Sequence, residues 1–121
     1  MVKIIAEIGI NHNGDIDLCK KLINLAYIAG ADYAKIQKRN PDVCVPEKQK
    51  SVMRDTPWGR MTYLDYKRRI EFNEEQIKEL VEYSDSLGIT FFASVWDKDS
   101  VDVMAKYCKI AKIGSASITD L

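Results

Sequence analysis

Two lysines occur in the same three-residue context, Ala-Lys-Ile, at Ala34–Ile36 and again at Ala111–Ile113. Each context falls in a short β-like segment, so the alanine and isoleucine would point to one face of a sheet and the lysine to the other. A lysine on a covered face is costly unless an anionic group meets it. Lys35 and Lys112 therefore predict a site for a phosphate or a carboxylate. The alternative that the pattern leaves open is a pair of strand-end charges whose ammonium groups reach solvent.

Other polar side chains could complete such a site. The hydroxyl groups of Ser94 and Ser115 can bind phosphate oxygens, and Glu7 can orient a sugar hydroxyl or relay a proton. The alternative for Glu7 is a structural ion pair with Lys35. Neither serine has a plausible basic partner, which argues against a serine nucleophile.

The elements that would position these residues alternate between β-like and helix-like segments. Strands are predicted near residues 2–8, 32–37, 89–95 and 109–115. Asp15 or Asp17 can cap the first helix, and a capping box that begins at Asn73 opens the second. The third helix begins near Asp97 or Asp99.

A long connection runs from Lys38 to Phe72. Connections of this length within one domain are usually functional or disordered. Its second half, residues 63–70, can form a helical turn or two. The charged run at residues 67–69 is interpreted as a solvated helix face, and Trp58 and Trp96 as core or loop anchors.

The element order βαβαβαβ predicts a parallel sheet with right-handed crossovers. A flavodoxin-like sheet and part of a (β/α)8 barrel both fit this order. The barrel is favoured because the polar strand positions lie near the C-terminal strand ends, where barrel active sites are found. The glycines also lack the spacing of a dinucleotide or P-loop motif. Residues 1–121 are therefore predicted to form an α/β domain, the parallel (βα)3β4 half of a TIM barrel.

The composition excludes several classes of protein. Eighteen basic residues balance eighteen acidic ones among 121, so no overall field favours nucleic acid or an anionic membrane. The three cysteines have no metal-ligand spacing, and His12 is the single histidine, so no two-histidine metal site fits. No signal peptide or membrane span is evident, and a cytoplasmic location is expected. Because a half barrel has two open edges, a homo-oligomer is expected as well.

Four stretches together resemble the sialic acid synthases, the N-acetylneuraminate synthase family. They are Ala6–Gly14, Lys35–Gln37, Phe92–Ser94 and Lys112–Ser115. The resemblance covers essentially the whole chain. It implies a (β/α)8 barrel followed by a small antifreeze-like domain. It also implies a carbon–carbon bond-forming transferase, which joins phosphoenolpyruvate to an N-acylated hexosamine of N-acetylmannosamine type, releases phosphate and uses a divalent metal, Mn or Mg.

The resemblance also implies roles for individual residues. Lys35, Ser94, Lys112 and Ser115 would bind phosphoenolpyruvate. Glu7 and Gln37 would face the sugar and the metal-bound water as catalytic residues. Ser117 departs from the family, where an acidic residue is typical, and the family's metal-ligand histidines lie on later strands that this chain lacks.

Three interpretations follow from this resemblance. The first is the N-terminal half of such a synthase, inactive by itself. The second is a non-catalytic half barrel that binds anions or self-assembles. The third is another phosphoenolpyruvate-condensing sugar-acid synthase.

Overall fold

Four parallel strands form the main sheet in the computed structural model, which describes residues 1–119. These strands are β1 (Ile5–Gly9), β2 (Tyr33–Lys38), β5 (Thr90–Val95) and β6 (Lys112–Ile113). They lie in this order across the sheet, and every neighbouring pair is parallel. The four predicted strands are thus confirmed. The last is shorter than predicted, because the chain enters a short 3-10 helix, η1 (Ser115–Ser117), soon after it.

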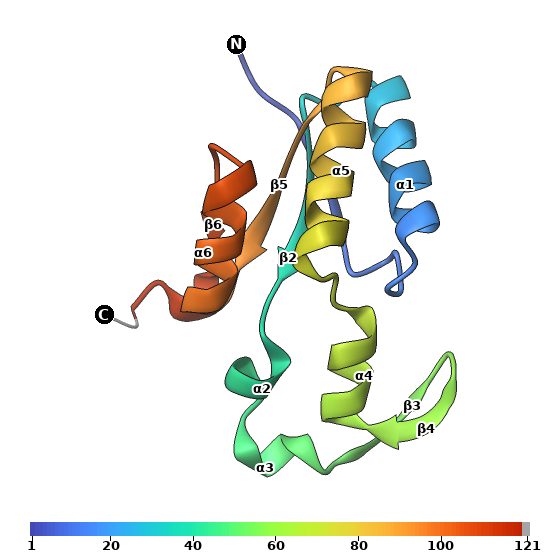
Figure 1. Ribbon diagram of the computed structural model, residues 1–121, viewed down its shortest axis with the longest axis vertical. Coiled ribbons are helices and arrows are strands. Elements are labelled where there is room, and N and C mark those ends of the chain that lie inside the picture. The colour runs from blue at the N-terminus through green and yellow to red at the C-terminus, as the bar shows by residue number, and fades with distance from the viewer. Residues whose placement is uncertain (120–121) are drawn as a thin grey trace.

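The strand order decides between the two architectures that the sequence allowed. A doubly wound sheet reverses its strand order at one point and carries helices on both faces. Here the order never reverses. The connecting helices α1 (Ile16–Ile28), α5 (Glu74–Leu87) and α6 (Lys98–Tyr107) contribute to one shared core (Figure 1). The chain is therefore the predicted (βα)3β4 half of a TIM barrel.

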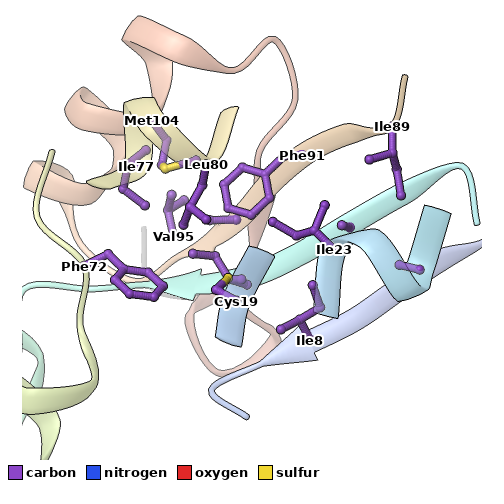
Figure 2. Packing of buried hydrophobic residues seen from close by; sticks show 14 residues of the cluster. Ile8, Cys19, Ile23, Phe72, Ile77, Leu80, Ile89, Phe91, Val95 and Met104 are labelled. Carbon is purple, nitrogen blue, oxygen red and sulfur yellow. The ribbon is translucent and has the colours of Figure 1, made fainter. Parts of the chain in front are cut away.

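The core lies between the three helices and one face of the sheet (Figure 2). Ala34, Ile36 and Ala93 supply this face from the strands, while Ile23 and Leu80 oppose them from α1 and α5, all fully buried. Burial of a side chain such as Ile23 or Leu80 contributes about 1.5–3 kcal/mol. Because alternate strand residues point to opposite faces, the polar set predicted from the sequence is left on the other face.

The helix starts follow the predicted caps. The Asp15 carboxylate accepts the backbone N–H of Leu18 at the start of α1, and that of Asp97 accepts the N–H of Ser100 in α6. The capping box of α5 is complete, with reciprocal bonds between Asn73 and Gln76. These caps satisfy backbone donors that a helix leaves free in its first turn.

The long connection after β2 is ordered into elements of its own. They are α2 (Pro41–Cys44), α3 (Glu47–Lys50), β3 (Met53–Thr56), β4 (Gly59–Thr62) and α4 (Tyr63–Ile70). Only α4 was predicted. β3 and β4 form an antiparallel hairpin. The group lies beyond the C-terminal ends of β2 and β5, at the bottom of Figure 1.

The interpretation of residues 67–69 as a solvated face is wrong for Lys67. Its side chain is buried, and its Nζ lies 5.2 Å from the ring centroid of Tyr63 and 5.3 Å from that of Tyr66. Arg68 is exposed and pairs with Asp42. Aromatic residues one position before and four before Lys67 on α4 hold its ammonium by cation–π contact. Within residues 1–119, no helix is long and apolar enough to cross a membrane.

Candidate anion-binding site at the C-terminal strand ends

The strand register places most of the predicted site residues on the sheet face away from the core. Glu7 pairs with Lys35 across β1 and β2, and Gln37 pairs with Ser94 across β2 and β5. Residues in register on parallel strands share a face, and so do residues two apart on one strand. Lys35 and Gln37 therefore join the two pairs into one polar group. Gln37 and Ser94 lie one residue before the ends of β2 and β5, as predicted, whereas Glu7 and Lys35 lie in the middle of β1 and β2.

Lys35 is the centre of this group. The residue is 1% exposed, and its Nζ lies 2.7 Å from Glu7 Oε1. The same ammonium donates a hydrogen bond to Ser94 Oγ at 2.6 Å. The two partners of this ion pair differ in burial, because 55% of the Glu7 side chain is exposed and only 2% of the Lys35 side chain. The Glu7–Lys35 ion pair that the sequence allowed is therefore present. It does not exclude an anion site at Lys35.

Two more side chains fix the direction of these hydrogen bonds. Trp96 Nε1 donates to Gln37 Oε1 at 2.8 Å, and Gln37 Nε2 donates to Glu7 Oε1 at 3.3 Å. An indole can only donate, so the amide oxygen of Gln37 must face Trp96 and its NH2 must face Glu7. Ser94 Oγ accepts from an ammonium, so its own proton can be donated to a further oxygen. Within residues 1–119, the second oxygen of Glu7 takes part in no hydrogen bond or ion pair.

Lys112 lies on the edge strand beside this group, and Ser115 follows that strand in η1. Lys112 pairs in register with Ser94 across β5 and β6, and therefore lies on the same face. Both residues are exposed. Within residues 1–119, no hydrogen bond or ion pair joins either of them to Glu7, Lys35, Gln37 or Ser94. The structure thus brings four of the six predicted residues together, and leaves Lys112 on the edge strand and Ser115 in η1 without a bond to them.

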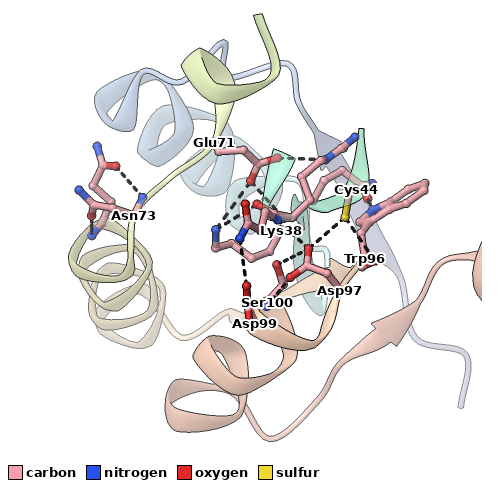
Figure 3. Close-up of polar contacts among 12 residues, drawn as sticks. Lys38, Cys44, Glu71, Asn73, Trp96, Asp97, Asp99 and Ser100 are labelled. Carbon is pink, nitrogen blue, oxygen red and sulfur yellow. Dashed lines mark hydrogen bonds and ion pairs between the residues drawn. The ribbon is translucent and has the colours of Figure 1, made fainter. Parts of the chain in front are cut away.

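A separate polar cluster ties the end of β2 to the end of α4 and to the start of α6 (Figure 3). Glu71 is its buried carboxylate. Its Oε1 lies 3.0 Å from Arg39 Nε, and its Oε2 lies 3.8 Å from Lys38 Nζ and accepts the backbone N–H of Arg39. Burial raises the pKa of Glu71 above its usual value. Sequence reasoning missed this cluster because its members lie 32 residues apart along the chain.

The thiol of Cys44 belongs to the same region. Its Sγ donates to Asp97 Oδ2 at 3.1 Å, beside Trp96 in Figure 3. Burial and this contact raise the pKa of Cys44 to about 12. Burial likewise raises the pKa of Cys19 to about 12. Neither thiol is activated as a nucleophile, because the thiolate is the reactive form.

Comparison with known proteins identifies the family. Residues 22–121 match the model of the NeuB family. The chain belongs to the NeuB family. The resemblance to sialic acid synthases is therefore confirmed.

Named NeuB relatives agree with this assignment. The chain is 42% identical over 103 residues to N-acetylneuraminate-9-phosphate synthase of Mus musculus, a match that covers 84% of this chain and 28% of that protein. It is 36% identical over 121 residues to N,N'-diacetyllegionaminic acid synthase of Campylobacter jejuni, which covers 98% of this chain and 36% of the relative.

The fold comparison gives the same result. The crystal structure of N-acetylneuraminic acid synthetase from Leptospira borgpetersenii, in complex with citrate, matches with a TM-score of 0.83 and 28% identity. That match covers 98% of this chain and 38% of the other. The chain therefore spans about a third of the length of these NeuB proteins.

The described part of this NeuB chain does not fit the divalent metal that the resemblance implies. Residues 1–119 contain no cluster of three or more His, Cys, Asp or Glu side chains that could hold a metal ion. His12 is unsuited as a ligand through Nδ1, because this atom accepts the backbone N–H of Gly14 at 3.0 Å. Within residues 1–119, no site for this metal is therefore assigned to His12 or to the acidic side chains.

His12 instead anchors the loop that follows β1. It is 1% exposed, and its ring stacks on Phe72 with a centroid distance of 4.3 Å. The backbone of Gly14 lies close to Arg69 at the end of α4. This loop thus joins β1, which carries Glu7, to the segment between α4 and α5.

The burial of His12 predicts a pH dependence of stability. Burial lowers its pKa from 6.5 to about 4, so the unfolded chain binds the proton first as the pH falls. The stabilisation is complete above pH 6.5 and is lost between 6.5 and about 4. The expected loss in free energy of unfolding is about 3 kcal/mol. Urea unfolding over this pH range measures it. His12→Gln should flatten the profile, and an unchanged slope in that variant would count against the assignment.

Trp96 is the site residue that sequence reasoning placed elsewhere. The sequence suggests a core or loop anchor, yet Trp96 holds Gln37 in place. The signal was present in the alternation of β5, because Trp96 stands two positions after Ser94 and so continues the same face. Arg39 gave no comparable signal, since it follows the end of β2.

Proposed function

We propose that this NeuB chain supplies the phosphoenolpyruvate-binding part of a synthase. Such an enzyme condenses phosphoenolpyruvate with an N-acylated hexosamine of N-acetylmannosamine type and releases phosphate. The product would be a nonulosonic acid, and the relatives are named as synthases of N-acetylneuraminate 9-phosphate and N,N'-diacetyllegionaminic acid. Because the chain spans about a third of their length, turnover by these 121 residues alone is not expected.

The observation that carries the proposal is the buried ammonium of Lys35, which is bonded to Ser94 near the C-terminal end of β5, the end of the strands where barrel active sites lie. A lysine ammonium has three donors. Two are used at short range by Glu7 and Ser94, while the contact to the Ile36 carbonyl is long, at 3.4 Å. An anion oxygen can therefore take the third donor.

The neighbouring residues extend this site in a way that suits phosphoenolpyruvate. Ser94 can donate its free proton to the same anion, and the exposed ammonium of Lys112 lies one strand further on the same face. Ser115 would add a hydroxyl at that edge. A ligand with both a phosphate and a carboxylate can engage two cations at once, which a single charge cannot do.

Glu7 and Gln37 are proposed to act on the sugar. The free oxygen of Glu7 is exposed, and the amide of Gln37 is held in one orientation by Trp96. A positioned carboxylate can hydrogen-bond a sugar hydroxyl or move a proton. The divalent metal expected from the resemblance, Mn or Mg, would be held by residues outside this set. A cytoplasmic location is part of the proposal, since the three free thiols suit a reducing compartment.

The direct test is calorimetric titration of the 121-residue chain with phosphoenolpyruvate, and with pyruvate for comparison. Phosphoenolpyruvate is expected to bind and pyruvate not, because pyruvate lacks the phosphate. Raising the salt concentration should weaken binding, since the exposed charge of Lys112 is screened. Equal affinity for both ligands, or no binding of phosphoenolpyruvate, would refute the proposal.

Self-association is a further part of this proposal. β1 and β6 are the outer strands of the sheet, and exposed strand edges invite pairing with another chain. Ile5 and Ile113 on these strands are 47% and 60% exposed. A dimer or a larger oligomer is expected by light scattering at tens of micromolar. A monomer at that concentration would contradict it.

A further inference from the structure

Glu71 is a buried carboxylate that the proposed function does not use. Only 9% of its side chain is exposed, and it directly follows α4, apart from the polar group around Lys35. Burying a charge is costly unless the charge is paired and hydrogen-bonded. Glu71 meets both conditions through Lys38 and Arg39, which follow the site residue Gln37 in the chain. These partners indicate what the carboxylate does.

Both oxygens of the Glu71 carboxylate contact Arg39 (Figure 3). Oε2 accepts the backbone N–H of Arg39 at 3.1 Å, and Oε1 lies 3.0 Å from Arg39 Nε. The second contact is an ion pair without the alignment of a hydrogen bond, since Nε has no hydrogen-bond partner within residues 1–119. The guanidinium is therefore held by the charge of Glu71, whereas the backbone contact needs only an oxygen acceptor.

Arg39 in turn lies against Trp96, which orients Gln37. The guanidinium carbon is 5.0 Å from the centroid of the Trp96 ring, a cation–π contact. Trp96 Nε1 donates to Gln37 Oε1 at 2.8 Å, and Gln37 Nε2 donates to Glu7 Oε1 at 3.3 Å. A continuous series of contacts therefore leads from the buried carboxylate of Glu71 to the exposed carboxylate of Glu7.

The next residue in the chain, Phe72, supports the other member of the Glu7–Gln37 pair. Its ring stacks on His12 at a centroid distance of 4.3 Å, and His12 belongs to the loop that follows β1. Glu7 lies on β1. Residues 71 and 72 thus support the ends of both β1 and β2, so the two strands that carry Glu7 and Gln37 are held from one point.

We propose that Glu71 is a positioning residue for the sugar-facing pair of Glu7 and Gln37, and that it acts through Arg39 and Trp96. The role of this pair toward the sugar rests on the proposed function. The series of contacts does not rest on it, because each step is a distance within the protein. Glu71 keeps the Gln37 amide turned toward Glu7 without itself joining the polar group around Lys35.

Glu71→Gln is the main test variant. It keeps the shape of the side chain and an oxygen that accepts the Arg39 N–H, and it removes the charge that holds the guanidinium. In NMR spectra the side-chain amide resonances of Gln37 are expected to move together with the indole N–H resonance of Trp96. The indole N–H of Trp58 should stay in place. Chemical shifts of the folded chain report local geometry, so a mere loss of stability would not produce this movement.

Two further variants isolate the route from Glu71 to Gln37. In Trp96→Phe the N–H donor is absent, so adding Glu71→Gln should not move the Gln37 resonances further. Arg39→Lys keeps the ion pair with Glu71 but lacks the planar group that stacks on the indole. It should move the same resonances as Glu71→Gln, and it tests the proposal even if Glu71→Gln does not fold.

Ligand affinity gives a second readout. By calorimetry, the affinity for N-acetylmannosamine is expected to fall about tenfold in Glu71→Gln. The affinity for phosphoenolpyruvate should be unchanged, because Lys35 and Ser94 keep their contact. Glu74→Gln is the matched control, since it makes the same change of charge three residues further on, at a carboxylate that pairs with Lys106. It should change neither readout.

Unmoved Gln37 resonances in Glu71→Gln and Arg39→Lys would overturn the proposal, as would an equal movement in Glu74→Gln. A movement that persists in the Trp96→Phe background would show that Glu71 does not act through Trp96. Equal losses of affinity for sugar and phosphoenolpyruvate would also count against it. If the resonances respond as expected but N-acetylmannosamine does not bind the parent chain, the proposed role toward the sugar fails and the positioning stands.

Discussion

Replacing Lys35 with methionine is expected to abolish phosphoenolpyruvate binding, with a loss in affinity of at least about 100-fold. The substitution keeps the length and the apolar stem of the side chain, so it removes the charge without opening a cavity. It also removes the donor to Ser94, which then loses its fixed orientation. Calorimetric titration of parent and variant measures the effect.

The fold should tolerate this change, because more than half of the Glu7 side chain is exposed and water can solvate it once Lys35 is gone. Thermal unfolding of Lys35→Met checks this point. Lys112→Met should also lose phosphoenolpyruvate binding, because it removes the second cation of the site. Lys78→Met is the control with an exposed lysine. If Lys78→Met weakens binding as much as Lys35→Met, the buried ammonium has no special role.

Gly14→Ala is expected to lower the free energy of unfolding by about 3 kcal/mol or more. Gly14 has a φ of +75°, and a Cβ on this residue would lie 2.2 Å from the carbonyl oxygen of Arg69. This neighbour is backbone at the end of α4 and cannot rotate away. The substitution therefore forces the loop after β1 away from α4. Urea unfolding measures the loss.

Gly30→Ala is the matched control for this prediction. Gly30 has a φ of +83°, and nothing lies within 4 Å of the position that its Cβ would take. Gly30→Ala should lower the free energy of unfolding by only roughly 1 to 2 kcal/mol, which is the cost of the left-handed conformation for a residue with a Cβ. The difference between the two variants isolates the close approach to Arg69. Equal losses would show that only backbone conformation matters at Gly14.

Local patterns in the sequence were sufficient to predict the strands and helices that bury a continuous apolar face. The capping box at Asn73 and the strands at the two Ala-Lys-Ile repeats were confirmed, because each depends on residues close in the chain. The position of Lys35 beside Glu7 and Ser94 could also be predicted from the sequence. Strand alternation puts all three on one face, and parallel strands bring their C-terminal ends to one edge.

The hairpin of β3 and β4 was not predictable in this way. Its first strand, Met53–Thr56, has no alternation of apolar and polar residues, and both strands are short. Contacts with α4 and its neighbours hold it, among them Arg54 over the Tyr63 ring at 5.3 Å and Arg69 over the Trp58 ring at 4.4 Å. Such contacts exist only once the helix and the hairpin have folded together.

By itself the sequence determined the half barrel and the face that carries Lys35, because periodicity and caps are properties of neighbouring residues. The tertiary structure alone decided which charges are buried. Lys67 looked like part of a solvated run, yet the fold covers it, while Lys112 looked like the equal of Lys35 and lies exposed on an edge strand. The physical reason is that burial depends on which distant segments pack over a side chain, and no local pattern records that.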